Sequence, residues 1–244
     1  MGVEAVPRYD ATPVARFSPT ERRLHRIHAV AFCVLLASGT VLWLPALAQA
    51  VSDRPLVKAI HLGAAVAWLT ALALVVVLGD RRALARTRRD IEAFDADDLL
   101  WLRRKKAPQG RFNAGQKVHA ILQAGLGVLF TVSGVLLWLG ERDTSLRFDG
   151  TIALHDAATF LGVVLVCGHM WKAYAKPESL EGMRRGTVRA DYAAREHPKW
   201  RAPPAGEGGG GDRATARPGQ VGLAAAVAVA GLTGIALLVS DVLG

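Results

Sequence analysis

The chain has 244 residues, of which 51% are hydrophobic, and its mean hydropathy is +0.24. With 30 Lys and Arg against 21 Asp and Glu, the formal net charge is +9 and the pI is about 10.1. The basic residues stand beside apolar blocks, which argues against nucleic-acid binding, and no Cys-x-x-Cys-His occurs, which excludes covalent c-type haem attachment.

Five apolar blocks follow one another along the chain, at about residues 29–50, 57–79, 118–140, 151–174 and 221–242. Each is long enough to cross the hydrocarbon layer of a bilayer, which takes about 20 helical residues. Backbone polar groups in lipid must be satisfied within the segment, so each block is expected to be a helix. The pattern predicts an all-α integral membrane protein.

The polar segments between these blocks differ in charge. Basic residues gather before the first block, between the second and third, and after the fourth, while the other two connections hold few. Because basic loops stay in the cytoplasm, we expect a cytoplasmic N-terminus and an outward end for the fifth block. Within the basic connections, residues 88–101 could form an amphipathic surface helix or a plain loop, and residues 202–220 read as a flexible Gly/Pro linker.

Ionisable side chains in or beside apolar blocks are rare and usually functional, and four of the seven histidines fall at depths there that suit a function. His28 falls at the inner side and His61 at the outer side. His155 and His169 are 14 residues apart in the fourth block. That spacing is about 21 Å along a helix and within about 40° of four full turns, so both imidazoles face one side at two levels.

Depth pairs these side chains as His28 with His169 on the inner side and His61 with His155 on the outer side. Bis-His ligation of two b-type haems would use this arrangement. Isolated polar residues facing a bundle interior are the alternative, whereas zinc would require its ligands at one depth. His25 and His197 are expected to be solvated surface residues.

Three glycines lie in helical phase with these histidines: Gly39, Gly79 and Gly162. Glycine would let a flat macrocycle approach a helix closely. Close packing of two helices in a membrane favours glycine equally.

Short motifs carry a family resemblance over about residues 20–201. They are RFNAGQK at 111–117, LHDAA at 154–158, GHM at 168–170, GMR at 182–184 and REHPKW at 195–200. In these motifs the chain resembles the cytochrome b (gamma) subunit of respiratory formate dehydrogenase, with a cytochrome b561-like four-helix fold.

The resemblance implies a four-helix dihaem cytochrome b bundle that anchors an iron–sulfur subunit and a molybdenum or tungsten catalytic subunit in the bacterial cytoplasmic membrane. It implies two b haems, held by the same four histidines, that pass electrons to menaquinone or ubiquinone. The quinone pocket would include Asn113, Gly115 and Gln116. Asn113 could instead serve only as a helix cap.

The chain departs from the family at three places. It has a fifth transmembrane helix, an acid, Asp156, directly after a predicted haem ligand, and His119 just inside the third block. His119 could help to protonate quinone or could be a buried packing residue.

These features divide the chain into an N-terminal tail (1–25), a dihaem domain (26–176), a cytoplasmic tail with linker (177–219) and the additional helix (220–244).

Other functions remain open at this stage. Similar anchors serve hydrogenases and thiosulfate or polysulfide reductases. A standalone cytochrome b561-like quinol or ferric reductase would need no iron–sulfur partner. A haem-free membrane anchor or transporter would bind no haem at all.

Overall fold

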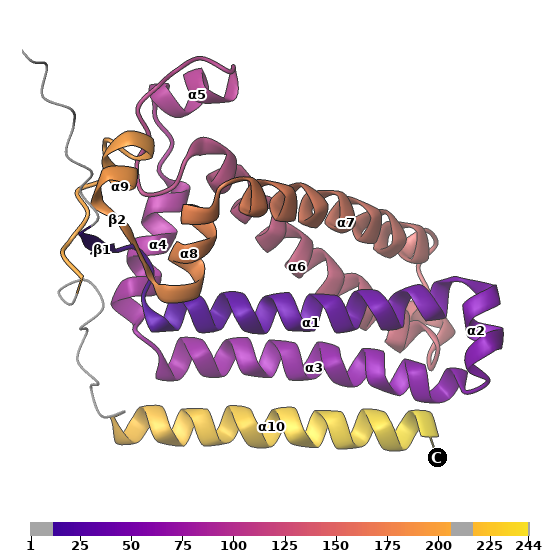
Figure 1. Ribbon diagram of the computed structural model, residues 1–244. Coiled ribbons are helices and arrows are strands. Elements are labelled where there is room, and N and C mark those ends of the chain that lie inside the picture. Colours follow the sequence, from indigo (N-terminus) through magenta and orange to yellow (C-terminus); the bar gives the residue numbers. More distant parts are fainter. Residues whose placement is uncertain (1–11, 206–216, 244) are drawn as a thin grey trace, which may run out of the picture. The chain divides into compact units, whose positions relative to one another are not determined.

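The computed structural model describes residues 12–205 and 217–243 and is almost entirely helical (Figure 1). The chain forms two compact units, one built from residues 1–18 and 85–211 and the other from residues 19–84 and 212–244. Each unit is described by itself below.

Three long helices make up the second unit: α1 (Pro19–Trp43), α3 (Arg54–Leu78) and α10 (Pro218–Leu243). All three are long and apolar enough to cross a membrane. They lie side by side in Figure 1, with α3 packed against both α1 and α10. A short helix, α2 (Pro45–Val51), joins α1 to α3.

The first predicted span differs from the observed one at both ends. The apolar block was expected at about 29–50, but the helix begins at Pro19 and ends at Trp43. Proline lacks a backbone N–H and clashes with the preceding turn, so Pro45 starts a new helix instead of continuing α1. His28 therefore lies in the third turn of α1.

Small residues bring α10 against α3. A Cβ on Gly231 would press directly on the Thr70 side chain, and a Cβ on Gly234 would contact Val66 at 3.5 Å. At the other end of the pair, the Gln220 side-chain amide donates to the Val77 carbonyl at 3.2 Å. This register makes the two helices antiparallel, and small residues at such a contact are typical of helix pairs in membranes.

Two more long helices dominate the first unit: α6 (Ala114–Gly140) and α7 (Thr151–Ala175). Both meet the same length and hydropathy criteria for a membrane span. They pack against each other and are joined by a short connection that holds one 3-10 turn, η1 (Thr144–Leu146). They form a helical hairpin.

The polar part of this unit has its own small core. Strand β1 (Pro13–Ala15) pairs antiparallel with β2 (Thr187–Arg189), and α8 (Pro177–Arg185) and α9 (Ala190–Glu196) flank β2. The Arg16 side chain, 3% exposed, donates to the Arg111 carbonyl at 3.0 Å and faces the rings of Phe17, Tyr192 and Trp200.

His197 contradicts the expectation of a solvated surface residue. Its side chain is 2% exposed, and its Nδ1 lies 2.6 Å from the Gly110 carbonyl. Because the residues that bury it come from distant parts of the chain, no local pattern marked this histidine as part of a core. Burial, together with the nearby Arg16 guanidinium, lowers the pKa of His197 to about 4.

This shift predicts an acid-sensitive stability. Between pH 6.5 and 4 the unfolded chain binds a proton at His197 that the folded chain does not, so stability falls as the pH is lowered through this window. For one such histidine, the free energy of unfolding should be about 2 kcal/mol lower at pH 5 than at pH 7.5. Thermal unfolding of the wild type, of His197→Gln and of a His25→Gln control at both pH values measures this. An unchanged pH slope in His197→Gln would contradict the assignment.

The basic connection after α3 is helical, which bears on the two readings left open for residues 88–101. It forms α4 (Arg81–Glu92) and α5 (Ala96–Leu102), with a break at residues 93–95. Asp95 and Asp98 make a reciprocal capping box at the start of α5, and this box explains the break. The predicted linker lies mostly outside the described residues, which resume just before α10.

Candidate functional site

His61, on α3, has one ring nitrogen fixed by a neighbouring helix. Its Nδ1 lies 2.9 Å from the Ser38 hydroxyl oxygen of α1. That hydroxyl has a single proton, which it donates to the Val34 carbonyl at 2.8 Å. When that proton bonds to the carbonyl, the hydroxyl oxygen accepts from Nδ1–H, and the Nε2 of His61 keeps its lone pair.

His155, on α7, has the same arrangement in the other unit. Its Nδ1 lies 2.8 Å from the hydroxyl oxygen of Ser133 on α6, and Ser133 is 1% exposed. The Ser133 hydroxyl donates to the Leu129 carbonyl at 2.6 Å, so it again accepts from the imidazole N–H. Both predicted outer histidines thus have a serine hydroxyl against Nδ1, a contact that suits the tautomer whose Nε2 is an electron-pair donor.

His28 lies on α1 at a different level from His61. Its ring centre is 5.5 Å from that of Trp68 on α3. The indole N–H of Trp68 is buried and has no hydrogen-bond partner among the described residues. Ten residues of α1 separate His28 from Ser38, the partner of His61, which corresponds to about 15 Å along the axis.

His169 lies towards the end of α7, where it meets a histidine of α6. The rings of His119 and His169 stack with centres 4.9 Å apart and planes 11° from parallel. The sequence placed both at the inner side, and the structure brings them into contact. His155 and His169 occupy one continuous helix, so their separation of about 21 Å follows directly from helix geometry.

The predicted quinone residues gather at the start of α6, the end of the hairpin at which His119 and His169 meet. Asn113 caps the helix: its Oδ1 accepts from the Gln116 N–H at 2.9 Å, and Gln116 Oε1 accepts from the Asn113 N–H at 3.0 Å. The carboxamide NH₂ groups of both side chains take no part in this box. Gly115 lies under the Trp101 indole, where an added Cβ would come within 2.9 Å of the ring.

A buried ion pair beside these residues was not predicted. The Lys117 ammonium donates to the Asp98 carboxylate and to the Ala93 carbonyl, both at 2.7 Å, and the two charged side chains are 8% and 3% exposed. Gln109, 3% exposed, accepts from the Ala114 N–H at 2.8 Å. The only signal in the sequence was an acidic run followed by a lysine 19 residues later, which does not specify a contact.

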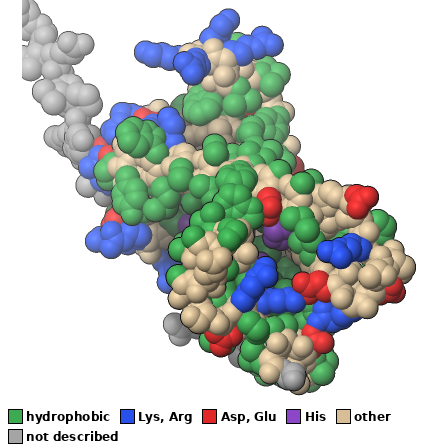
Figure 2. Space-filling view, turned by 90° about the vertical axis from the view of Figure 1, so that its right-hand side faces the viewer, with side chains coloured by type: hydrophobic (Ala, Val, Ile, Leu, Met, Phe, Trp, Pro, Cys, Tyr) green, Lys and Arg blue, Asp and Glu red, His purple; other side chains and the backbone are tan. Residues whose placement is uncertain are grey.

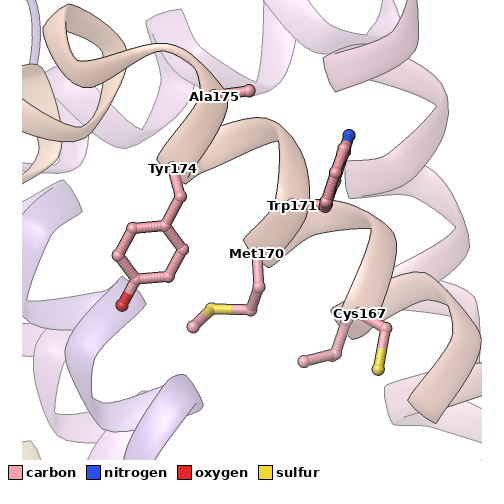
Figure 3. Close-up of a pocket in the computed structure, with 6 residues that line it drawn as sticks. Cys167, Met170, Trp171, Tyr174 and Ala175 are labelled. Carbon is pink, nitrogen blue, oxygen red and sulfur yellow. The ribbon is translucent and has the colours of Figure 1, made fainter.

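An apolar pocket follows α7 next to His169. It is lined by Val166, Cys167, Met170, Trp171, Tyr174 and Ala175. The Met170 and Tyr174 side chains, one turn apart, extend from the same side of the helix (Figure 3). The pocket offers almost no polar atoms and suits an apolar occupant.

Two of the glycines predicted to lie in phase with the histidines have different neighbours. A Cβ on Gly39 would come within 3.3 Å of the His61 ring, so this glycine does leave room beside a predicted ligand. Gly79 lies at the end of α3, where a Cβ would come within 2.5 Å of the Thr20 side chain of α1. Close helix packing explains Gly79.

Known proteins are similar to this chain in sequence. A family model described as prokaryotic cytochrome b561 matches residues 16–186, well over half of the chain. The cytochrome b556(Fdn) subunit of the nitrate-inducible formate dehydrogenase of Escherichia coli strain K12 is 26% identical over 119 residues, which cover 43% of this chain and 55% of that subunit. The chain thus spans about half the length of this relative. The cytochrome b556(fdo) subunit of formate dehydrogenase from the same strain is 23% identical over 203 residues, which cover 77% of this chain and 91% of that subunit.

The family match covers the first four apolar helices and ends before α10 begins. Five helices long and apolar enough to cross a membrane agree with a multi-pass membrane protein. The chain belongs to the prokaryotic cytochrome b561 family, and it is a membrane cytochrome b of the electron-transfer type, for which b-type haem is the implied cofactor.

Proposed function

We propose that this chain holds two b haems, one between His61 and His155 and the other between His28 and His169, and delivers electrons to a membrane quinone. The observation that carries the proposal is the serine-held imidazole, which occurs once in each unit. When bound, a bis-His b haem supplies a one-electron redox couple with both axial positions filled.

Ser38 and Ser133 would orient the proposed ligands His61 and His155 and would not contact the iron themselves. Metal-ligating histidines usually donate their second ring N–H to an oxygen, which fixes the tautomer and the ring orientation. Here the acceptors would be hydroxyls whose own protons can bond to helix carbonyls, which supports donation from the imidazole N–H. Nε2 is then the atom available to iron on both His61 and His155.

Other features of the described residues suit a porphyrin. Gly39 leaves space next to His61 on the predicted outer level. At the level of His28, the buried indole N–H of Trp68 lacks an acceptor, and the carboxylates of b haem are acceptors. Each unit holds two of the four imidazoles, at two levels along its helices, as two stacked haems require.

Removal of one serine hydroxyl should loosen one haem. Ser133→Ala leaves the His155 N–H without its acceptor, and such partners of ligating histidines are worth about 10- to 100-fold in affinity. We expect one haem to be lost faster to competing apomyoglobin, and we expect the spectrum of that haem to change. Thr131→Ala is the matched control, because the Thr131 hydroxyl on the same helix bonds, among the described residues, only to the Gly127 carbonyl. Equal haem retention in both variants would contradict the role of Ser133.

The quinone site is proposed at the start of α6, beside His119 and His169. The capping box uses only the amide oxygens of Asn113 and Gln116, so their NH₂ groups can still donate. A quinone carbonyl is an acceptor for such donors. The apolar pocket along α7 suits the hydrocarbon part of such a ligand.

Asn113→Ser separates capping from quinone binding. Serine caps a helix about as well as asparagine, so α6 keeps its N-terminus, but the amide donor is lost. Quinone reduction by the dithionite-reduced protein should slow about 5- to 13-fold, since a hydrogen bond worth roughly 1–1.5 kcal/mol is removed. Both haems and the unfolding temperature should be unchanged. A normal quinone rate in Asn113→Ser would remove Asn113 from the site.

The named relatives are cytochrome b subunits of formate dehydrogenases, which supports a similar complex here. We propose that the chain anchors an iron–sulfur subunit and a molybdenum or tungsten catalytic subunit in the bacterial cytoplasmic membrane, with its N-terminus in the cytoplasm. Purification of the tagged chain from its native membrane tests this. Co-purification of an iron–sulfur protein supports the complex, and its absence favours a standalone quinol or ferric reductase.

A further inference from the structure

One surface of the first unit combines exposed apolar side chains with unpaired positive charge. It lies on residues 94–106, here called the α5 segment. Its apolar members are Phe94, Leu99 and Leu102, which are 41%, 55% and 43% exposed. Directly after α5 come four consecutive basic residues, all exposed: Arg103, Arg104, Lys105 and Lys106. Figure 2 shows Lys and Arg side chains gathered above hydrophobic ones at the top of the molecule, where Figure 1 places α5.

The acidic side chains of the α5 segment are all bound by lysines from elsewhere in the unit. Asp98 pairs with Lys117 at 2.7 Å, and Lys199 bridges Asp95 at 2.7 Å and Asp97 at 2.5 Å. None of the four basic residues at 103–106 makes an ion pair with a described residue. The charge that this segment presents outward is therefore positive.

The backbone after α5 turns sharply at Arg104. This residue has a φ of 60°, a left-handed conformation that glycine adopts readily and a side chain with a Cβ does not. The Arg104 N–H donates to the Trp101 carbonyl at 2.9 Å and the Lys105 N–H to the Leu100 carbonyl at 3.0 Å, which is the usual glycine-terminated helix end. Arg104 thus occupies a position that glycine would take with less strain, but glycine would carry no positive charge.

The same unit fixes α5 next to the start of a membrane span. The Trp101 ring lies against Gly115 in the first turn of α6, and the Lys117–Asp98 pair joins the two helices a half-turn further on. Since α6 is long and apolar enough to cross the membrane, its first turn lies near the membrane–water boundary. The α5 segment is held at the same boundary.

We propose that the α5 segment binds the anionic phospholipid head groups of the leaflet at which α6 begins. Arg103, Arg104, Lys105 and Lys106 contact the head-group phosphates, while Leu99 and Leu102 enter the boundary with the acyl chains. Apolar side chains beside clustered basic ones are the composition that binds anionic membrane surfaces. This proposal does not depend on the haem and quinone assignments.

A nitroxide at position 99 tests the proposal in the full-length holoprotein. Leu99→Cys is spin-labelled in a background in which Cys33 and Cys167 are alanine, and the protein is placed in nanodiscs of phosphatidylcholine with or without phosphatidylglycerol. The anionic lipid should lower the accessibility of the label to a water-soluble relaxation agent by at least about fivefold, the effect expected of one basic residue near an anionic surface. A label on Asp149→Cys, in the exposed α6–α7 connection, should not respond.

Two further variants assign the effect to charge. Replacement of residues 103–106 by glutamine should abolish the response to phosphatidylglycerol, whereas Arg103→Lys with Arg104→Lys should keep it. Inorganic phosphate added to phosphatidylcholine nanodiscs should not reproduce it. Full accessibility of the label in anionic nanodiscs would overturn the proposal. So would the same protection in the four-glutamine variant, or protection by phosphate alone.

Discussion

Replacement of His155 by alanine is expected to remove one haem and leave the other. His155 is the proposed ligand on which Ser133 acts, and alanine offers iron no replacement donor. His169→Ala should remove the other haem, because about 21 Å of α7 separates the two side chains and the proposed sites share no ligand. A pyridine haemochromogen assay against protein concentration measures each loss, and low-temperature spectra should show a different band missing in each variant.

His25→Ala is the matched control for these variants. His25 lies on α1 three residues before His28, so the variant removes an imidazole from the same helix without removing a proposed ligand. It should retain both haems. If His155→Ala or His169→Ala also retained both haems, the ligand assignment would be wrong, and loss of both haems in His25→Ala would point to general unfolding.

Lys117→Met should be strongly destabilising. The substitution leaves the Asp98 carboxylate, 3% exposed, without its cationic partner in a buried site. Removal of one partner of a buried ion pair costs about 3–5 kcal/mol, because the other charge remains buried and unpaired. The free energy of unfolding in detergent, from denaturant titration, measures the loss. We also expect weaker packing of Trp101 against Gly115, because the pair joins α5 to α6.

Two comparisons isolate the buried charge. Lys176→Met breaks a 2.5 Å pair with Glu196 whose side chains are about half exposed, so it should cost less than about 1 kcal/mol. The double variant Lys117→Met/Asp98→Asn removes both charges of the pair and should recover much of the stability lost in Lys117→Met. Similar losses in Lys117→Met and Lys176→Met would contradict a special role for the buried pair.

The long elements were predictable because one physical requirement decides them. A membrane span must be apolar and about 20 residues long, and the five apolar blocks correspond to α1, α3, α6, α7 and α10. Hydropathy does not detect where a helix is interrupted, however. Pro45 gave the only local signal that α1 ends at Trp43, and the polar start of α1, from Pro19, carries no apolar signal.

Contacts between distant residues account for what the sequence did not reveal. A serine in an apolar helix ordinarily bonds to its own backbone, as Ser38 and Ser133 do, and nothing local shows that the same oxygen also meets an imidazole. The burial of His197 and the Lys117–Asp98 pair likewise depend on tertiary packing. The stack of His119 on His169 was the most nearly predictable of these contacts, because the sequence placed both residues at the inner side of the membrane.

The haem-to-protein ratio of the purified full-length chain tests the proposed electron path most directly. Two b haems per chain are expected, both low-spin by electron paramagnetic resonance, since each iron would have two imidazole ligands. A ratio of one or less, or a high-spin signal from iron with an open axial position, would contradict two bis-histidine sites built on His28, His61, His155 and His169.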